Sequence, residues 1–290
     1  QGYFVYDSKK AGAVTVSRLR FGLKPNRAPY LVQGADFVGI HQFPFVDRFD
    51  PLKRARPGAT LLINSPHGPQ GTWDRLPLEL QSEIIGLGVK LFVIDAYAVA
   101  AEAGVGRRIN TVMQTCWFAI SGVLPAEEAI TRIKAAIDKT YGKRGAQVLA
   151  SNHRAVDNAL AALQQVEVPA APTTTRRRPA PVSHEAPDLV QRVLGMMLGN
   201  NGDLLPVSAF PVDGTWPTGT ARWEKRNLAQ EIPSWDAALC IQCNKCAMVC
   251  PHAAIRIKAF PSSMARVLPE GTPTLPYKGR ELNDHRYIVQ

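Results

Sequence analysis

The sequence predicts an α/β domain with a largely parallel sheet, followed by a linker and a small, partial α+β domain. Three observations predict this order: apolar runs separated by helix-like stretches in residues 1–166, a proline-rich stretch from residue 167, and a cysteine-rich run after residue 234. A chain of 290 residues has room for about two domains. Its apolar share of 46% is normal for a protein that buries a core.

Residues 1–166 contain two kinds of predicted strand. Ala13–Leu19 alternates apolar and polar side chains, as a strand with one exposed face does. Thr60–Asn64 and Leu91–Asp95 are apolar runs, which fit strands covered on both faces by helices, as in a parallel sheet.

Helices are predicted between and after these strands, over roughly residues 72–87, 96–103, 109–121, 126–141 and 147–166. The fourth has the strongest support, because Pro125 precedes it, Glu127 and Glu128 lie in its first turn, and an apolar stripe follows. The motif G-x-G-x-x-G opens none of these helices, so the sequence does not predict a dinucleotide site.

Residues 167–233 are predicted to be a proline-rich linker and a connecting segment. The composition around residues 167–187 is typical of a semi-extended linker without a core of its own. Arg176–Arg178 is expected to be a solvated, flexible charge cluster. Phe210, Trp216 and Trp223 are spaced like anchors of a segment that lies across another domain.

Four cysteines lie close together near the end of the chain. Cys240, Cys243, Cys246 and Cys250, followed by Pro251, have the spacing C-x2-C-x2-C-x3-C-P that is known from bacterial ferredoxins. The first three thiolates can reach three corners of one [4Fe–4S] cube, whereas the fourth is turned away and is expected to bind a second cube. Residues 234–290 are therefore predicted to be a partial bacterial ferredoxin-like domain.

Other roles for the cysteines are weighed against this one. Structural zinc sites usually separate their two cysteine pairs by a dozen or more residues, but here all four lie within residues 240–250. A disulfide framework needs a higher density of cysteines than this chain has. Cys116 lies in an apolar helical stretch and is expected to be a buried small hydrophobe.

The chain is basic, with 34 Lys and Arg against 24 Asp and Glu. These charges are dispersed, so a nucleic-acid partner is not expected, while an acidic electron carrier would be attracted faster by such a surface. No apolar run approaches the roughly 18 residues needed to span a bilayer, and the N-terminus has no signal pattern. We therefore expect a cytoplasmic location, which suits thiolate-bound iron.

Long stretches resemble one family, the single-chain pyruvate:ferredoxin (flavodoxin) oxidoreductases. These stretches are residues 1–10 with 13–17, 92–97, 108–114, 205–211, 223–226 and 240–251. The resemblance implies an N-terminally incomplete gamma-type domain in residues 1–166 and the start of a two-cluster ferredoxin domain in residues 234–290. It also implies pyruvate cleavage with thiamine diphosphate and Mg²⁺, electron transfer to ferredoxin or flavodoxin, acetyl transfer to coenzyme A, and a homodimer.

One motif of that family is missing from these residues. The chain has no G-D-G motif followed by an asparagine, which would hold the Mg²⁺ and diphosphate of thiamine diphosphate, so this segment alone is not expected to cleave pyruvate. We interpret the 290 residues as an internal segment of the longer enzyme. The alternative is a standalone iron–sulfur electron-transfer subunit without a catalytic role.

Two groups of residues are candidates for binding coenzyme A, whose phosphates need positive charge and N–H donors. The first follows an apolar strand, and the second precedes a helix, whose N-terminus favours anions. The candidates are Ser8, Lys9 and Lys10, and Arg107, Arg108 and Asn110. Solvated lysines and an ordinary capping turn remain the other interpretation.

Overall fold

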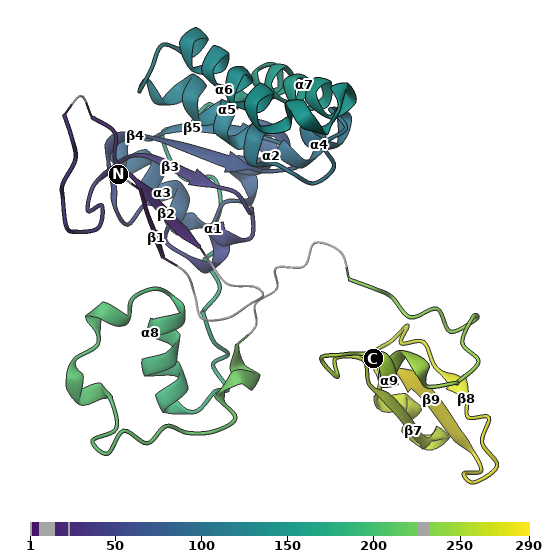
Figure 1. Ribbon diagram of the computed structural model, residues 1–290. Coiled ribbons are helices and arrows are strands. Elements are labelled where there is room, and N and C mark those ends of the chain that lie inside the picture. Colours follow the sequence, from purple (N-terminus) through teal and green to yellow (C-terminus); the bar gives the residue numbers. More distant parts are fainter. Residues whose placement is uncertain (1, 6–14, 23, 225–231) are drawn as a thin grey trace. The chain divides into compact units, whose positions relative to one another are not determined.

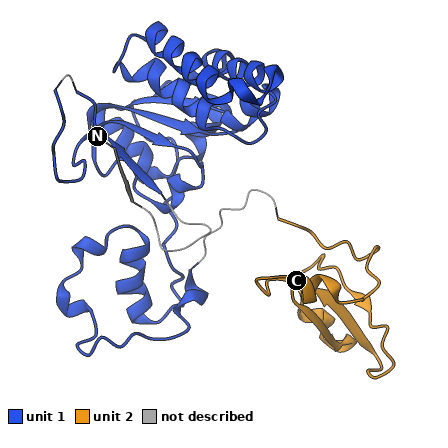
Figure 2. Cartoon of the chain, viewed as in Figure 1, with its two compact units in different colours: residues 1–228 blue, residues 229–290 orange. Residues whose placement is uncertain are grey.

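The computed structural model describes residues 2–5, 15–22, 24–224 and 232–290 (Figure 1). The chain divides into two compact units, residues 1–228 and residues 229–290 (Figure 2). Within the described residues, none of the helices combines the length and the apolar character that a membrane span needs.

The main sheet of the first unit is largely parallel, as the sequence predicts. Strands β3 (Ala35–Ile40), β4 (Ala55–Asn64) and β5 (Lys90–Ile94) pair in parallel, and the short β6 (Gln164–Gln165) adds to β5 in the antiparallel sense. A separate antiparallel pair is formed by β1 (Gly2–Val5) and β2 (Val16–Leu19). β2 confirms the described part of the alternating strand, whose residues 13–14 lie outside the described residues.

Helices cover both faces of the main sheet (Figure 1). Leu61 and Ile63 of β4 pack in a core with the helices of one face, and Leu62 packs in a core with the helices of the other face. This alternation places β4 between two apolar layers. The first layer contains α1 (Phe45–Arg48), α2 (Gly68–Arg75) and α3 (Leu78–Leu87). The second layer contains α4 (Ala96–Glu102), α5 (Asn110–Ser121) and α7 (Ala146–Ala162). Helix α6 (Ala126–Tyr141) and the 3-10 turn η1 (Gly142–Arg144) lie against this second layer.

Most predicted helices are confirmed, but two predictions were wrong in extent. The helix predicted over residues 72–87 is two helices, α2 and α3, because Leu76 before Pro77 takes an extended conformation, with ψ 141°. The last predicted helix stops at Ala162 instead of Val166, since the following glutamines pair with β5 as strand β6. Strand β3 was not predicted.

The arginine-rich part of the predicted linker packs against helices α1 to α3 of the first unit, to which it also belongs. We call residues 173–178 the docked segment. The backbone N–H of Leu78 donates to the carbonyl of Arg176 at 2.7 Å, and the Arg176 guanidinium lies 2.8 Å from the carboxylate of Asp47. The backbone N–H of Arg178 donates to the carboxylate of Glu79 at 2.9 Å. The arginines are solvated as predicted, since the side chains of Arg176 and Arg177 are 41% and 76% exposed. Acidic side chains of α1 and α3 nevertheless bind them, so the expectation of a flexible cluster is not confirmed.

The polar side chains of α2 and α3 fix the start of the docked segment. The Trp73 indole N–H donates to the Thr173 hydroxyl at 2.9 Å, and the Gln81 side-chain oxygen accepts the backbone N–H of Thr173 at 2.8 Å. Trp73 and Gln81 are fully buried. These bonds satisfy polar groups that would otherwise be costly to bury.

The connecting segment forms a small core of its own, made by Val182, Ala186, Val190 and Leu194, with Trp223 packed against it. The prediction that residues 167–187 lack a core was therefore wrong at their end, where Val182 and Ala186 are buried. Phe210 and Trp216 lie near each other, but 38% and 39% of their surfaces are exposed. The expected anchoring of all three aromatic residues on another domain is not confirmed. The helical turns of this segment are η2 (Val190–Leu194), α8 (Gly195–Leu198), η3 (Gly202–Leu204), η4 (Val207–Ala209) and η5 (Thr220–Trp223).

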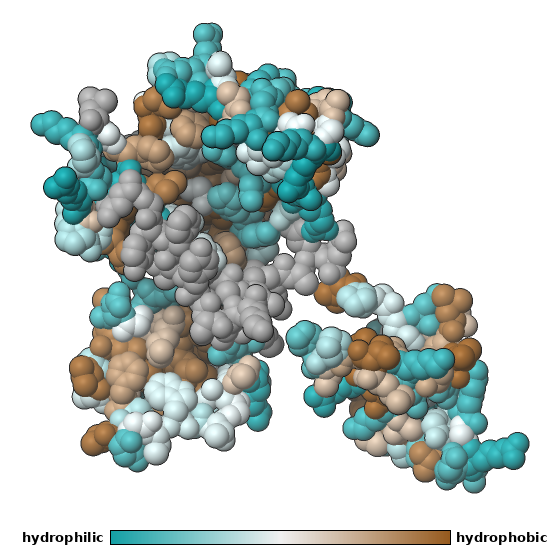
Figure 3. All heavy atoms as spheres, viewed as in Figure 1, coloured by the Kyte–Doolittle hydropathy of each residue, from teal (hydrophilic) through white to brown (hydrophobic). Residues whose placement is uncertain are grey.

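The second unit contains a small antiparallel sheet in the order β7-β9-β8, formed by β7 (Ile257–Pro261), β9 (His285–Val289) and β8 (Leu275–Pro276). The short helix α9 (Lys245–Val249) and the 3-10 helix η6 (Ser262–Val267) accompany it. The strand predicted over residues 254–258 begins only at Ile257, and the one predicted over residues 286–289 lies within β9. Hydrophobic residues are visible on the surface of this unit in Figure 3.

Candidate functional site

The cysteine run forms a loop that leads into helix α9. Cys240 and Cys243 lie on the loop, Cys246 lies in the first turn of α9, and Cys250 directly follows the helix. Cys243 and Cys246 are exposed, Cys240 and Cys250 are half-buried, and all four are free thiols. The structure thus presents these thiols at the surface, where a cluster can reach them.

The three leading cysteines lie near enough to one buried tyrosine to act on it electrostatically. Tyr287 of β9 is only 3% exposed. Burial and the neighbouring charges of Cys240, Cys246 and Cys243 raise the pKa of Tyr287 above its ordinary value. The hydroxyl therefore stays protonated over a wide pH range, and it donates a 2.8 Å hydrogen bond to the side-chain oxygen of Asn244.

Cys250 has a different environment. The backbone N–H groups of Ile255, His252 and Ala254, with a smaller effect of Ala253, lower the pKa of the Cys250 thiol. The N–H of Ala254 lies 3.3 Å from its sulfur, and Ala253 has a positive φ of 49°, which bends this backbone around the thiol. Such a nest of N–H groups stabilises a thiolate, the form that binds iron.

No group of three or more His, Cys, Asp or Glu side chains in the described residues has the arrangement that holds a single metal ion. A cube differs from such a site, because each thiolate binds a different iron atom. The exposed thiols of this loop are soft ligands, which iron–sulfur clusters prefer.

A second candidate site is a polar pocket of about 560 Å³ in the first unit. Gly104 and Gly106, with φ of 80° and 68°, turn the chain so that Arg107 and Arg108 line one side of it. The Arg107 guanidinium lies over the Tyr97 ring, 5.5 Å from its centroid. The opposite side is the start of helix α7.

Polar residues of α7 that were not predicted from the sequence complete this pocket. Gln147, Ser151 and Asn152 line it, and Ser151 and Asn152 are buried. Ser151 and Asn152 lie one helical turn before the buried Ala155 and Val156, so these two polar residues interrupt the apolar face of α7. That interruption is the signal that could have pointed to them.

Among the other predicted coenzyme A residues, the described Asn110 does not line this pocket. Asn110 is the first residue of α5 and is exposed. Ser8, Lys9 and Lys10 lie outside the described residues. Cys116 is buried as predicted, and burial raises its pKa to about 12, so it is an inert thiol.

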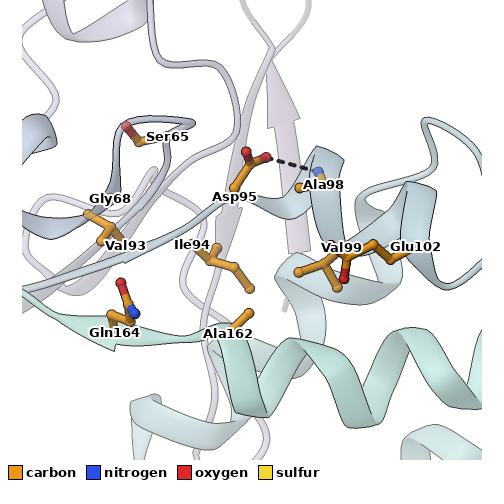
Figure 4. A pocket seen from close by; sticks show the side chains of 10 residues that line it. All are labelled: Ser65, Gly68, Val93, Ile94, Asp95, Ala98, Val99, Glu102, Ala162 and Gln164. Carbon is orange, nitrogen blue, oxygen red and sulfur yellow. Dashed lines mark hydrogen bonds between the residues drawn. The ribbon is translucent and has the colours of Figure 1, made fainter.

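A smaller pocket, of about 240 Å³, lies at the carboxyl ends of β4 and β5 (Figure 4). Its polar residues include Ser65, Asp95, Glu102 and Gln164. The carboxylate of Asp95 caps helix α4 by accepting the N–H of Ala98 at 2.9 Å. Ser65 is 1% exposed and accepts a hydrogen bond from the hydroxyl of Thr72. The side chains of Asp95 and Ser65 therefore have structural roles.

Three family models match the chain in succession. Residues 1–162 match the model described as pyruvate ferredoxin/flavodoxin oxidoreductase. Residues 175–229 match a domain of unknown function, and residues 232–255 match a 4Fe-4S binding domain.

Curated relatives match over the whole chain. A pyruvate-flavodoxin oxidoreductase from Rhodospirillum rubrum is 57% identical over 290 residues, which are 100% of this chain and 24% of that protein. One from Nostoc sp. is 47% identical over 297 residues, 100% of this chain and 25% of that protein. The chain therefore spans about a quarter of the length of these relatives. Among solved structures, a pyruvate oxidoreductase subunit from Thermotoga maritima matches 58% of this chain and 81% of its own, with 17% identity and a TM-score of 0.44.

Proposed function

Because the chain belongs to the pyruvate ferredoxin/flavodoxin oxidoreductase family, we propose that it is the electron-carrying segment of a pyruvate oxidoreductase that acetylates coenzyme A. Its relatives contain the same stretch within chains about four times as long, which favours this role over that of a standalone electron-transfer subunit. The physiological acceptor would be a ferredoxin or a flavodoxin. A cytoplasmic location and a homodimer belong to the same proposal.

We assign three parts to this segment. Residues 1–166 would be the gamma-type domain, residues 167–233 the connecting segment and residues 234–290 the first part of the ferredoxin domain. Thiamine diphosphate and Mg²⁺ would bind elsewhere in the longer enzyme, since these residues lack the G-D-G motif that holds them.

The cysteine loop carries the proposal. Cys240, Cys243 and Cys246 would bind one [4Fe–4S] cube, and Cys250 would bind a second one. The support is the placement of the first three thiols on one loop near Tyr287 and the separate N–H contact of Cys250. A bound cube supplies one-electron transfer; the protein contributes thiolates, and its N–H groups stabilise their negative charge.

The arginine-lined pocket would bind the phosphates of coenzyme A. Arg107 and Arg108 supply positive charge, and the buried polar residues of α7 supply hydrogen-bonding groups beside it. A pocket of about 560 Å³ is large enough for the phosphate-bearing part of such a ligand.

Iron analysis of the intact, anaerobically purified protein tests the cluster assignment. Cys243→Ala is expected to remove about one cluster, roughly four iron atoms, together with its electron paramagnetic resonance (EPR) signal. Cys116→Ala removes a thiol far from the loop in sequence and is the matched control, for which iron content should stay unchanged. Full iron content in Cys243→Ala would refute the assignment.

A further inference from the structure

Two residues between the cysteines adopt a backbone conformation that their side chains do not favour. Gln242 and Asn244 both have a φ of 61°, in the left-handed region where glycine is the usual residue. Asparagine is common there, but glutamine is not. A residue keeps such a strained backbone conformation only where its contacts stabilise it, so the contacts of these two side chains show what the conformation is used for.

The side chain of Gln242 binds the open edge of the small sheet. Its amide NH₂ donates to the carbonyl of Pro276 at 2.7 Å, and its amide oxygen accepts the backbone N–H of Lys278 at 3.0 Å. Tyr277 lies between these two residues, and its backbone N–H points to the other side, where it donates to the carbonyl of His285 on β9. Backbone groups alternate in direction along a strand, so the groups of residues 276 and 278 point away from β9.

Gln242 thus replaces a neighbouring strand at this edge. β8 lies at the edge of the sheet order β7-β9-β8, and an edge strand leaves backbone donors and acceptors unpaired. One side-chain amide pairs with both a carbonyl and an N–H there, as the peptide group of an adjacent strand would.

Asn244 fastens the loop to the sheet a second time. Its side-chain oxygen accepts the hydroxyl hydrogen of Tyr287, which lies on β9 and is buried. Its backbone carbonyl accepts the N–H groups of Ala247 and Met248, so the same residue starts helix α9. The two attachment points alternate with the cysteines in the order Cys240, Gln242, Cys243, Asn244, Cys246.

We propose that Gln242 and the Asn244–Tyr287 pair are positioning residues that fasten the cysteine loop to the β7-β9-β8 sheet and thereby determine how long the protein retains its iron–sulfur cluster. This inference rests on the proposed role of Cys240, Cys243 and Cys246 as cluster ligands. Because loss of a cube requires the loop to open, each attachment slows iron release.

The first test uses substitutions that relieve the backbone conformation but remove the side-chain contact. Gln242→Gly and Gln242→Asn favour a positive φ more than glutamine does, yet glycine has no amide and asparagine is one methylene too short. In the intact, iron-loaded protein, we expect a chelator to release about one cluster's iron roughly five- to tenfold faster from both variants, the effect of one or two lost hydrogen bonds. Release at the wild-type rate or slower would show that only the backbone conformation matters, and would overturn the proposal.

The second test is a double-mutant cycle on the same release rate. Asn244→Ala and Tyr287→Phe remove the two ends of one hydrogen bond, so the double variant should release iron no faster than the more affected single variant. Tyr277→Phe is the matched control, since its hydroxyl donates to the carboxylate of Glu281, at 3.5 Å, and not to the cysteine loop within the described residues. Additive effects of the two substitutions would overturn the proposed pairing.

Cys243→Ala, measured in parallel, separates a failure of the cluster-ligand assignment from a failure of the positioning role. If this variant keeps all its iron, the ligand assignment fails and the inference fails with it. If it loses one cluster while the Gln242 and Tyr287 variants release iron normally, the ligand assignment stands and only the positioning role is refuted.

Discussion

The fourth cysteine gives the sharpest test at the scale of single residues. Cys250 has its own N–H nest, whereas the charges of the other three cysteines act on Tyr287. If Cys250 binds a second cube, the iron losses of Cys250→Ala and Cys243→Ala should add, to roughly eight iron atoms in the double variant. If all four cysteines bind one cube, the double variant should lose no more iron than either single variant. Iron analysis of the intact protein decides between these outcomes.

Arg108 offers the corresponding test for the arginine-lined pocket. Arg108→Ala is expected to raise the KM for coenzyme A roughly tenfold in the full enzyme, as loss of a charge-assisted hydrogen bond would. The KM for pyruvate should be nearly unchanged. Arg144→Ala is the matched control, because Arg144 is exposed near the start of α7 but does not line the pocket. Equal effects on both substrates would indicate a folding defect instead of a binding site.

Single residues were predictable where the chemistry is local. The cysteine spacing identifies the thiols without any structure, and Arg107 and Arg108 follow two glycines in sequence. Ser151 and Asn152 were missed because they lie on another helix, more than 40 residues after Arg108. Gln242 was missed for the same reason, since its bonds join it to residues 276 and 278.

Among the elements, helix α6 matches its predicted limits of Ala126 and Tyr141. Its proline, acidic first turn and apolar stripe all indicate the same helix, so local and tertiary preferences agree. Strand β3 lacks such agreement, because Asp36 and Gly39 interrupt its apolar pattern, and its pairing with β4 supplies what the pattern does not. The docked segment was missed because its acidic contacts, Glu79 and Asp47, lie 99 and 129 residues earlier in the chain.

Glu83 of α3, whose charge interacts with that of Arg178 in the docked segment, makes the stability of the first unit depend on pH. Burial and the neighbouring charge of Asp50 raise the pKa of Glu83 from 4.5 to about 7, although Arg178 acts in the opposite direction. The folded state therefore holds more protons than the unfolded chain between these pKa values, and its stability falls as the pH rises through this window.

Glu83→Gln should remove this loss of stability at high pH. At pH 8 the variant is expected to be more stable than the parent chain by roughly 1 kcal/mol, a figure reduced because solvent screens a half-exposed carboxylate. Near pH 4.5 this electrostatic advantage should vanish. Urea unfolding followed by far-UV circular dichroism across this range measures the effect, with exposed Glu102→Gln as the control. A pH-independent difference would mean that packing, not ionisation, separates the two proteins.

At the scale of the whole molecule, the two units differ in how much apolar surface they bury. Within the described residues, the first unit has extended cores on both faces of its sheet. The described part of the second unit buries only Phe260, Tyr287 and Ile288 as apolar side chains. A unit with so small a core usually needs a metal centre or another covalent constraint to stay folded.

Removal of iron should therefore unfold the second unit and leave the first intact. Cluster binding is then part of the folding free energy of residues 229–290, because ligands spread along the loop meet only in the folded state. Hydrogen exchange of the iron-loaded protein, measured anaerobically before and after chelation, tests this. Peptides from β7 and β9 should lose their protection, while peptides from β4 and α6 should keep theirs. Unchanged protection of β9 after complete iron removal would show that the small sheet is stable by itself, and that the cluster is bound by a preformed unit instead of holding it together.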